Sequence, residues 1–316
     1  MAQQAKTAYQ CGNWAEAERL CREILTKMPN TAEALNVLGI ITAQTNRSLE
    51  AADLLSRAIT IAPNDAVAQG NLGNVLLGLG RTEEALAHFD RVIAVRPDDA
   101  DVLYIRSGIL GGLARYEETL QSCDRALAVK PDFPEALNNR GNALGKLNRH
   151  AEALESFESA LSLKPDYAEA LNNRGAVLRE LKRYDEALTS YRQAIEVAPE
   201  FVEAIYNLGI VLSELARPQE AVKVYERALT LRPDHVEANW NLALCRLQLG
   251  DYRQGWEGYE WRWHERQQKE GKRKFPQPLW LGAESLEGKT ILLHGEAGLG
   301  DTLQFCRYTR FVAARG

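Results

Sequence analysis

The chain has 316 residues, of which 45% are hydrophobic and 26% are charged, and its formal net charge is −5. This composition is typical of a globular protein, and it disfavours a nucleic-acid surface because phosphate binding needs clustered lysine and arginine. No apolar run is long enough to cross a bilayer, and the polar start MAQQAKTAYQ lacks the apolar core of a signal peptide. We therefore expect a cytoplasmic protein that binds neither nucleic acid nor a membrane.

The cysteines are odd in number and show no C-x-x-C spacing. This pattern indicates neither a disulfide framework nor a zinc site, so we expect small apolar core residues and no metal or other cofactor. The five cysteines are Cys11, Cys21, Cys123, Cys245 and Cys306.

Seven of the eleven prolines recur at intervals of 34 residues. They are Pro29, Pro63, Pro97, Pro131, Pro165, Pro199 and Pro233. When each unit is numbered so that its proline is position 32, position 8 is glycine in five units: Gly39, Gly73, Gly141, Gly175 and Gly209. Position 24 is large in the same five: Leu55, Phe89, Phe157, Tyr191 and Tyr225. Small and large residues at helical spacing predict two interlocked helices in each unit.

The ends of these helices also carry signals. The proline disfavours helical geometry in the residue before it, so we expect it to end the second helix of each unit. An acidic residue after the proline, followed three residues later by glutamate, predicts a capping box at the next helix. The predicted boxes are Asp132 with Glu135, Asp166 with Glu169, and Asp234 with Glu237.

The period and these positions resemble the tetratricopeptide repeat family. The resemblance covers residues 1–268 and implies an all-α, right-handed superhelix with about seven regular repeats and an atypical eighth. It further implies that the first helix of each repeat lines a concave groove. We expect the first helix of repeat 1 to be shortened.

Position 6 of the first helix is asparagine in five of six repeats. A row of carboxamides can hydrogen-bond the backbone of an extended peptide, and this row resembles the one in the arm of O-linked N-acetylglucosamine transferases. In the alternative interpretation, the amides bond to neighbouring backbone and fix the turns between repeats. The peptide-binding candidates are Asn71, Asn139, Asn173, Asn207 and Asn241, with Asn138, Asn172 and Tyr206 beside them.

Two sets of charged residues accompany this row. We expect Arg106, Arg140 and Arg174 at position 7 to pack their stems and expose their guanidinium groups, or alternatively to bind an anion. Acids at position 2 would repel a terminal carboxylate and favour basic or neutral peptides, unless they only stabilise the helix starts. These acids are Glu33, Asp101, Glu135, Glu169, Glu203 and Glu237.

The pattern changes after repeat 7. The segment WEGYEWRW is strongly aromatic, and we expect its rings to pack against the residues that follow. Residues 269–288 are predicted to be a linker, and residues 289–316 predict a strand, a glycine-bearing loop and a helix. That order is typical of the first βα unit of a Rossmann-like domain.

The strand followed by GLGD resembles the start of heptosyltransferase-like glycosyltransferases, which in bacteria are fused to tetratricopeptide arms. The resemblance implies Asp301 as a candidate general base and Gly298 and Gly300 as part of a sugar-nucleotide loop. Such an enzyme needs further strands and a second lobe, so we expect this chain to be inactive by itself and to belong to a longer enzyme.

Two functions remain open at this stage. The chain is either the substrate-recruiting arm of a bacterial protein glycosyltransferase or a non-enzymatic adaptor for protein assembly. Self-association, with a homodimer formed through the C-terminal segment, is a further possibility.

Overall fold

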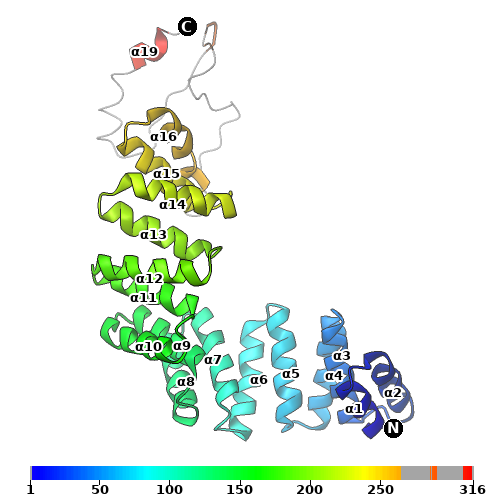
Figure 1. The fold of residues 1–316 in the computed structure, drawn as a ribbon. Coiled ribbons are helices and arrows are strands. Elements are labelled where there is room, and N and C mark those ends of the chain that lie inside the picture. Colours follow the sequence, from blue (N-terminus) through cyan, green and yellow to red (C-terminus); the bar gives the residue numbers. More distant parts are fainter. Residues whose placement is uncertain (1, 265–284, 286, 290–308, 315–316) are drawn as a thin grey trace. The chain divides into compact units, whose positions relative to one another are not determined.

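The computed structural model describes residues 2–264, 285, 287–289 and 309–314. The described part contains 17 helices and no strand, which confirms the predicted all-α repeat superhelix. The chain divides into two units, residues 1–262, which hold the helices labelled α1 to α16 in Figure 1, and residues 263–316. The strand predicted after Lys289 lies outside the described residues.

Helices alternate along the first unit as pairs, one pair in each repeat. The first helices are α1 (Ala2–Gln10), α3 (Ala32–Gln44), α5 (Ala66–Gly78), α7 (Ala100–Gly112), α9 (Pro134–Lys146), α11 (Ala168–Glu180), α13 (Val202–Glu214) and α15 (Val236–Gln248). The second helices are α2 (Trp14–Lys27), α4 (Ser48–Ile61), α6 (Thr82–Val95), α8 (Tyr116–Val129), α10 (His150–Leu163), α12 (Tyr184–Val197), α14 (Pro218–Leu231) and α16 (Tyr252–Tyr259).

The two terminal pairs differ from the regular ones. Helix α1, which begins at Ala2, has 9 residues where the other first helices have 13. Helix α16 has 8 residues where the other second helices have 14. In the second unit, α19 (Thr309–Ala313) lies in the segment where the sequence predicts a helix.

Glycine at position 8 allows the two helices of a repeat to approach closely. A Cβ atom on Gly209 would lie 2.5 Å from Cε1 of Tyr225, and one on Gly141 would lie 2.6 Å from Cε1 of Phe157. Both rings are fully buried, so the large residue fills the space that the missing side chain leaves. The sequence predicts a close helix approach at position 8, and the structure adds that the large residue of position 24 in the same repeat fills that approach.

Repeat 4 uses a different pair at these positions. Ser107 replaces the glycine and Cys123 replaces the large residue, and both are fully buried. Cys21 and Cys245 are also buried, as predicted, whereas Cys11 is exposed and Cys306 lies outside the described residues. The prediction of core cysteines is therefore wrong for Cys11.

The turn inside each repeat places position 15 in the left-handed region. Its φ is positive in all eight repeats, from 53° at Ala216 to 85° at Gly250. The next residue is arginine in repeats 2 to 7, and in repeats 3 to 7 its guanidinium donates to both carboxylate oxygens of the glutamate three residues later. These pairs are Arg81–Glu84, Arg115–Glu118, Arg149–Glu152, Arg183–Glu186 and Arg217–Glu220.

The turns between repeats correct the predicted capping boxes. The N-cap residues of α9, α11 and α15 are Phe133, Tyr167 and His235, one residue later than the predicted acids. Phe133 and Tyr167 make no side-chain capping bond. The second helices end as predicted, because the residue before each proline adopts an extended C-cap conformation, with φ −131° at Lys130.

Adjacent repeats contact each other mainly through the second helix of one repeat and the first helix of the next. Each second helix packs on its own first helix and on the next one, and α9 also packs directly on α11. Side chains at positions 5 and 6 face neighbouring first helices, and the polar residues there make the bonds described next.

Candidate functional site

The five position-6 asparagines bridge neighbouring repeats. Each is partly buried and donates a hydrogen bond from Nδ2 to a side chain of the preceding repeat. The bonds are Asn71 to Asn36 Oδ1 at 2.9 Å, Asn139 to Ser107 Oγ at 3.1 Å, Asn173 to Asn138 Oδ1 at 3.0 Å, Asn207 to Asn172 Oδ1 at 3.0 Å, and Asn241 to Tyr206 OH at 3.2 Å. We call these five asparagines the amide row.

In repeats 5 to 7 the amides join into one chain of bonds. Asn172 donates to Oδ1 of Asn173 at 3.4 Å, which links the Asn173–Asn138 bond to the Asn207–Asn172 bond. Every inter-repeat bond donated by the amide row points from the later repeat to the earlier one. Hydrogen bonds in such a chain polarise each other, so the central amides hold one orientation.

A carboxamide has two donor hydrogens and an acceptor oxygen, and the inter-repeat bond uses one donor. Asn207 therefore retains an N–H and its Oδ1, since no hydrogen bond to that oxygen is formed within the described part of the chain. The amide row is interrupted in repeat 4, where Ile105 occupies position 6. Asn139 reaches past that position to the buried Ser107.

The candidate residues beside the row act as its acceptors. Asn138 and Asn172 are 6% and 9% exposed, so they are core residues that orient the amides. The Tyr206 ring lies 4.8 Å from the His235 ring, and its hydroxyl accepts from Asn241. Sequence reasoning missed Ser107 as an acceptor, because it replaces a glycine and does not lie at position 5.

The position-7 arginines do not present free guanidinium groups, which corrects the expectation of surface exposure. Arg106 is 18% exposed and donates to Asp90 at 2.7 Å and to Ser122 at 2.6 Å. Arg140 repeats this arrangement with Asp124 and Ser156. The aspartate belongs to the preceding second helix and the serine to the arginine's own second helix, so the guanidinium joins three helices.

Arg174 is the third member of this set. Its Nε donates to Ser190 at 3.0 Å and its Nη2 donates to Gln193 at 3.1 Å. Burial lowers the pKa of Arg174, and the nearby carboxylate of Glu158 opposes that effect. These contacts favour a structural role over anion binding.

Most position-2 acids pair with a cation of the chain. Glu203 lies 2.9 Å from Arg232, Glu135 lies 3.7 Å from Lys164, and Asp101 lies 3.8 Å from Lys130.

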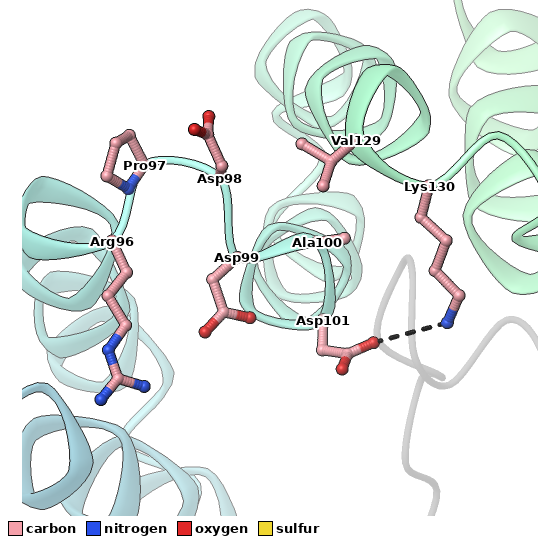
Figure 2. Close-up of a pocket in the computed structure, with 8 residues that line it drawn as sticks. All are labelled: Arg96, Pro97, Asp98, Asp99, Ala100, Asp101, Val129 and Lys130. Carbon is pink, nitrogen blue, oxygen red and sulfur yellow. Dashed lines mark ion pairs between the residues drawn. The ribbon is translucent and has the colours of Figure 1, made fainter.

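An open hollow of about 610 Å³ lies at the turn between α6 and α7. Figure 2 shows its lining, with Asp98, Asp99 and Asp101 at one turn and Lys130 reaching Asp101. Asp99 caps α7 by accepting from the backbone N–H of Val102 at 3.2 Å.

The predicted catalytic and sugar-nucleotide residues Asp301, Gly298 and Gly300 lie outside the described residues. In the part of the chain that is described, no group of three or more His, Cys, Asp or Glu side chains could hold a metal ion. In the same part, no helix is both long and apolar enough to span a bilayer.

The geometry is that of a helical-repeat protein with the amide row along its first helices. Three family models described as tetratricopeptide repeat match residues 3–66, 43–109, and 132–200 with 166–234. Together these matches cover more than half of the sequence, and the chain belongs to the tetratricopeptide repeat family. No curated protein matches the sequence.

Solved structures share the fold. The C-terminal part of a repeat-containing protein from Cytophaga hutchinsonii has a TM-score of 0.60 at 17% identity, covering 77% of this chain and 99% of that one. A structure titled as the APC/C hetero-tetramer Cut9–Hcn1 has a TM-score of 0.59 at 17% identity, with 77% of this chain aligned to 48% of that chain. This chain therefore spans about half of that relative. PilF of Pseudomonas aeruginosa has a TM-score of 0.55 at 21% identity, covering 66% and 94%.

Proposed function

We propose that the chain binds an extended peptide segment of a partner protein along its first helices, through the amide row. The observation that carries this proposal is that each of the five asparagines is oriented by a bond to the preceding repeat. An amide whose orientation is already fixed loses little entropy when it binds a peptide backbone, and preorganisation of this kind favours affinity. The second N–H of each amide, and the oxygen of an amide such as Asn207, can hydrogen-bond the C=O and N–H groups of an extended chain.

The same bonds also support repeat packing, so the experiment must separate binding from stability. Twelve-residue peptides displayed on phage would be selected on the wild-type chain. Affinity for the selected peptides would then be measured after changing Asn139, Asn173 and Asn207 together to alanine. Each hydrogen bond from an asparagine to the bound peptide contributes about 0.5 to 1.5 kcal/mol. We therefore expect the affinity of the triple variant to fall at least about tenfold.

The matched control changes Asn30 and Asn64, both in exposed turns, to alanine and should leave affinity unchanged. Melting temperatures are recorded for every variant. If the triple variant melts much earlier but binds peptides as wild type does, the amides serve only to join repeats. Selection of no peptide at all by the wild-type chain would also contradict the proposal.

We further propose that this array is the substrate-recruiting arm of a bacterial protein glycosyltransferase that acts in the cytoplasm. Support comes from the resemblance of residues 289–316 to the start of a glycosyltransferase domain, with Asp301 as general base and Gly298 and Gly300 at the sugar nucleotide. The reading frame after Gly316 tests this: further βα units support the enzyme. A stop codon there leaves the adaptor function, or self-association through the C-terminal segment.

A further inference from the structure

The turn between repeats 4 and 5 holds a cation of the chain between an aromatic ring and a carboxylate. The Nζ atom of Lys130 lies 4.1 Å from the centre of the Phe133 ring and 3.8 Å from Oδ1 of Asp101. Figure 2 shows the pair formed by Lys130 and Asp101. The Phe133 side chain is 6% exposed beneath this lysine. In sequence, the acid precedes the lysine by 29 residues and the ring follows it by three.

The next turn repeats the arrangement with the same spacing. Lys164 lies 4.6 Å from the centre of the Tyr167 ring and 3.7 Å from Oε1 of Glu135. Two turns further along, Arg232 takes the place of the lysine and donates to Glu203 at 2.9 Å, with His235 at the aromatic position. Three turns of one chain thus place their own cation beside the acid.

The turn between repeats 6 and 7 keeps the ring and the acid but has alanine at the position of the cation, and the arginine that does reach this turn, Arg227, donates to the carbonyl of Pro199 at 2.7 Å. Its residues at the same spacing are Glu169, Ala198 and Phe201. Glu169 is exposed, and within the described ranges no Lys, Arg or His lies within ion-pair distance of its carboxylate. Phe201 and Ala198 are both partly exposed. The turns that follow repeats 2 and 3 cannot hold a cation in this way. They carry Asp65 and Asp99 at the position of the aromatic ring.

We propose that Glu169 and Phe201 bind a lysine or arginine side chain supplied by a partner protein. A cation over an aromatic face gains electrostatic attraction from the ring quadrupole, and a neighbouring carboxylate adds to it. Lys130 and Lys164 show that this ring-and-acid geometry accommodates an ammonium group in this fold. The site lies outside the amide row, and it rests on the proposed function only in requiring a protein partner.

The direct test uses a small probe and the full chain. The protein is labelled with 4-fluorophenylalanine, and the Phe201 resonance is assigned by its loss in Phe201→Leu. Titration with acetyl-Gly-Lys-Gly-amide should shift this resonance in a saturable way, whereas the matched norleucine peptide should not. Glu169→Gln should weaken binding of the lysine peptide about fivefold, which is the scale of an exposed cation–carboxylate interaction.

A second experiment places a lysine of the chain itself in the site. Ala198→Lys supplies the cation that repeats 4 and 5 carry, so it should move the Phe201 resonance by itself and abolish the response to the lysine peptide. The control is Ala62→Lys, which places a lysine at the equivalent point of repeat 2, where Asp65 replaces the ring. That variant should respond as wild type does.

The inference is overturned if the lysine and norleucine peptides give equal shifts, if neither gives a shift, or if Ala198→Lys binds the probe like wild type. Its failure is distinguishable from failure of the proposed function. The variant with Asn139, Asn173 and Asn207 changed to alanine loses peptide affinity if the amide row binds backbone, but it should keep the Phe201 response.

Discussion

At the residue scale, the turn inside each repeat imposes one unusual backbone conformation. Position 15 has positive φ in every repeat, and three repeats place glycine there: Gly12, Gly80 and Gly250. Ala114, Lys182 and Ala216 adopt the same conformation with a side chain. A Cβ atom in the left-handed region is strained, whereas glycine is not.

We predict that Ala216→Gly stabilises the protein by about 0.5 to 1 kcal/mol, because relief of strain exceeds the entropy that glycine adds to the unfolded chain. The measurement is the urea unfolding midpoint. Ala62→Gly is the control, since Ala62 has φ −128° and gains nothing from glycine, so that variant should be destabilised. Equal effects in the two variants would contradict the argument.

Position 24 offers a second comparison within one chain. Tyr225 and Tyr191 are both fully buried, but the hydroxyl of Tyr225 pairs with Ser213 at 3.4 Å while that of Tyr191 has no partner in the described structure. Repeat 6 carries Arg179 where repeat 7 carries Ser213. Two other repeats use phenylalanine at position 24, Phe89 and Phe157.

We predict that Tyr191→Phe stabilises the chain by about 1 kcal/mol, because it removes a buried hydroxyl that makes no hydrogen bond. Tyr225→Phe should destabilise it by about 0.5 to 1 kcal/mol, because Ser213 then loses a partner. Thermal unfolding of the two variants checks the opposite signs. A loss of stability in both would show that the Tyr191 hydroxyl is bonded in solution.

At the element scale, charged side chains join the second helices of repeats 1 and 2. Glu18 of α2 accepts from Arg47, the N-cap residue of α4, at 2.6 Å. Arg22 donates to both Glu18 and Glu50 at 2.7 Å, which closes the network between α2 and α4. The bond from Arg47 is the main cause that lowers the pKa of Glu18 to about 2, and Arg22 adds to it.

A carboxylate whose pKa falls on folding stabilises the protein above its unfolded pKa, near 4.5, and loses that contribution as the pH falls toward 2. We predict that Glu18→Gln lowers the urea midpoint at pH 7, by the equivalent of about 1 kcal/mol, and lowers it much less at pH 3. The measurement is the wild-type minus variant difference at each pH. A difference that does not change with pH would exclude an ionised Glu18 as the cause.

Helix starts were predicted less well than helix ends. Proline constrains its neighbour by sterics within two residues, so the ends of the second helices follow from sequence. Acidic residues in the turns gave the capping boxes at Asp132, Asp166 and Asp234, but each helix begins one residue later, after an aromatic side chain or His235. An N-cap side chain of this kind packs on position 5 of the preceding first helix: the ring centres of Phe133, the N-cap of α9, and Tyr104 of α7 lie 5.0 Å apart. Tertiary packing therefore decided the start.

At the scale of the whole molecule, each repeat completes its core with the next one. The largest buried cluster runs from Leu144 to Cys245 and includes residues of four repeats. Arrays of this kind draw their stability from repeats and from the interfaces between neighbours. Many polar contacts follow the same rule, because the amide row and two of the position-7 arginines, Arg106 and Arg140, bind across a repeat boundary.

The sequence by itself determined the period, the two helices of each repeat and the positions of the small and large core residues, because these depend on spacings within one unit. It also located the amide row. Only the tertiary structure decided that each asparagine donates to a side chain up to 35 residues earlier, and that Arg106 and Arg140 are bound between helices. Such contacts depend on how one repeat is stacked on the next, and that geometry is set by packing across the boundary rather than by any local pattern.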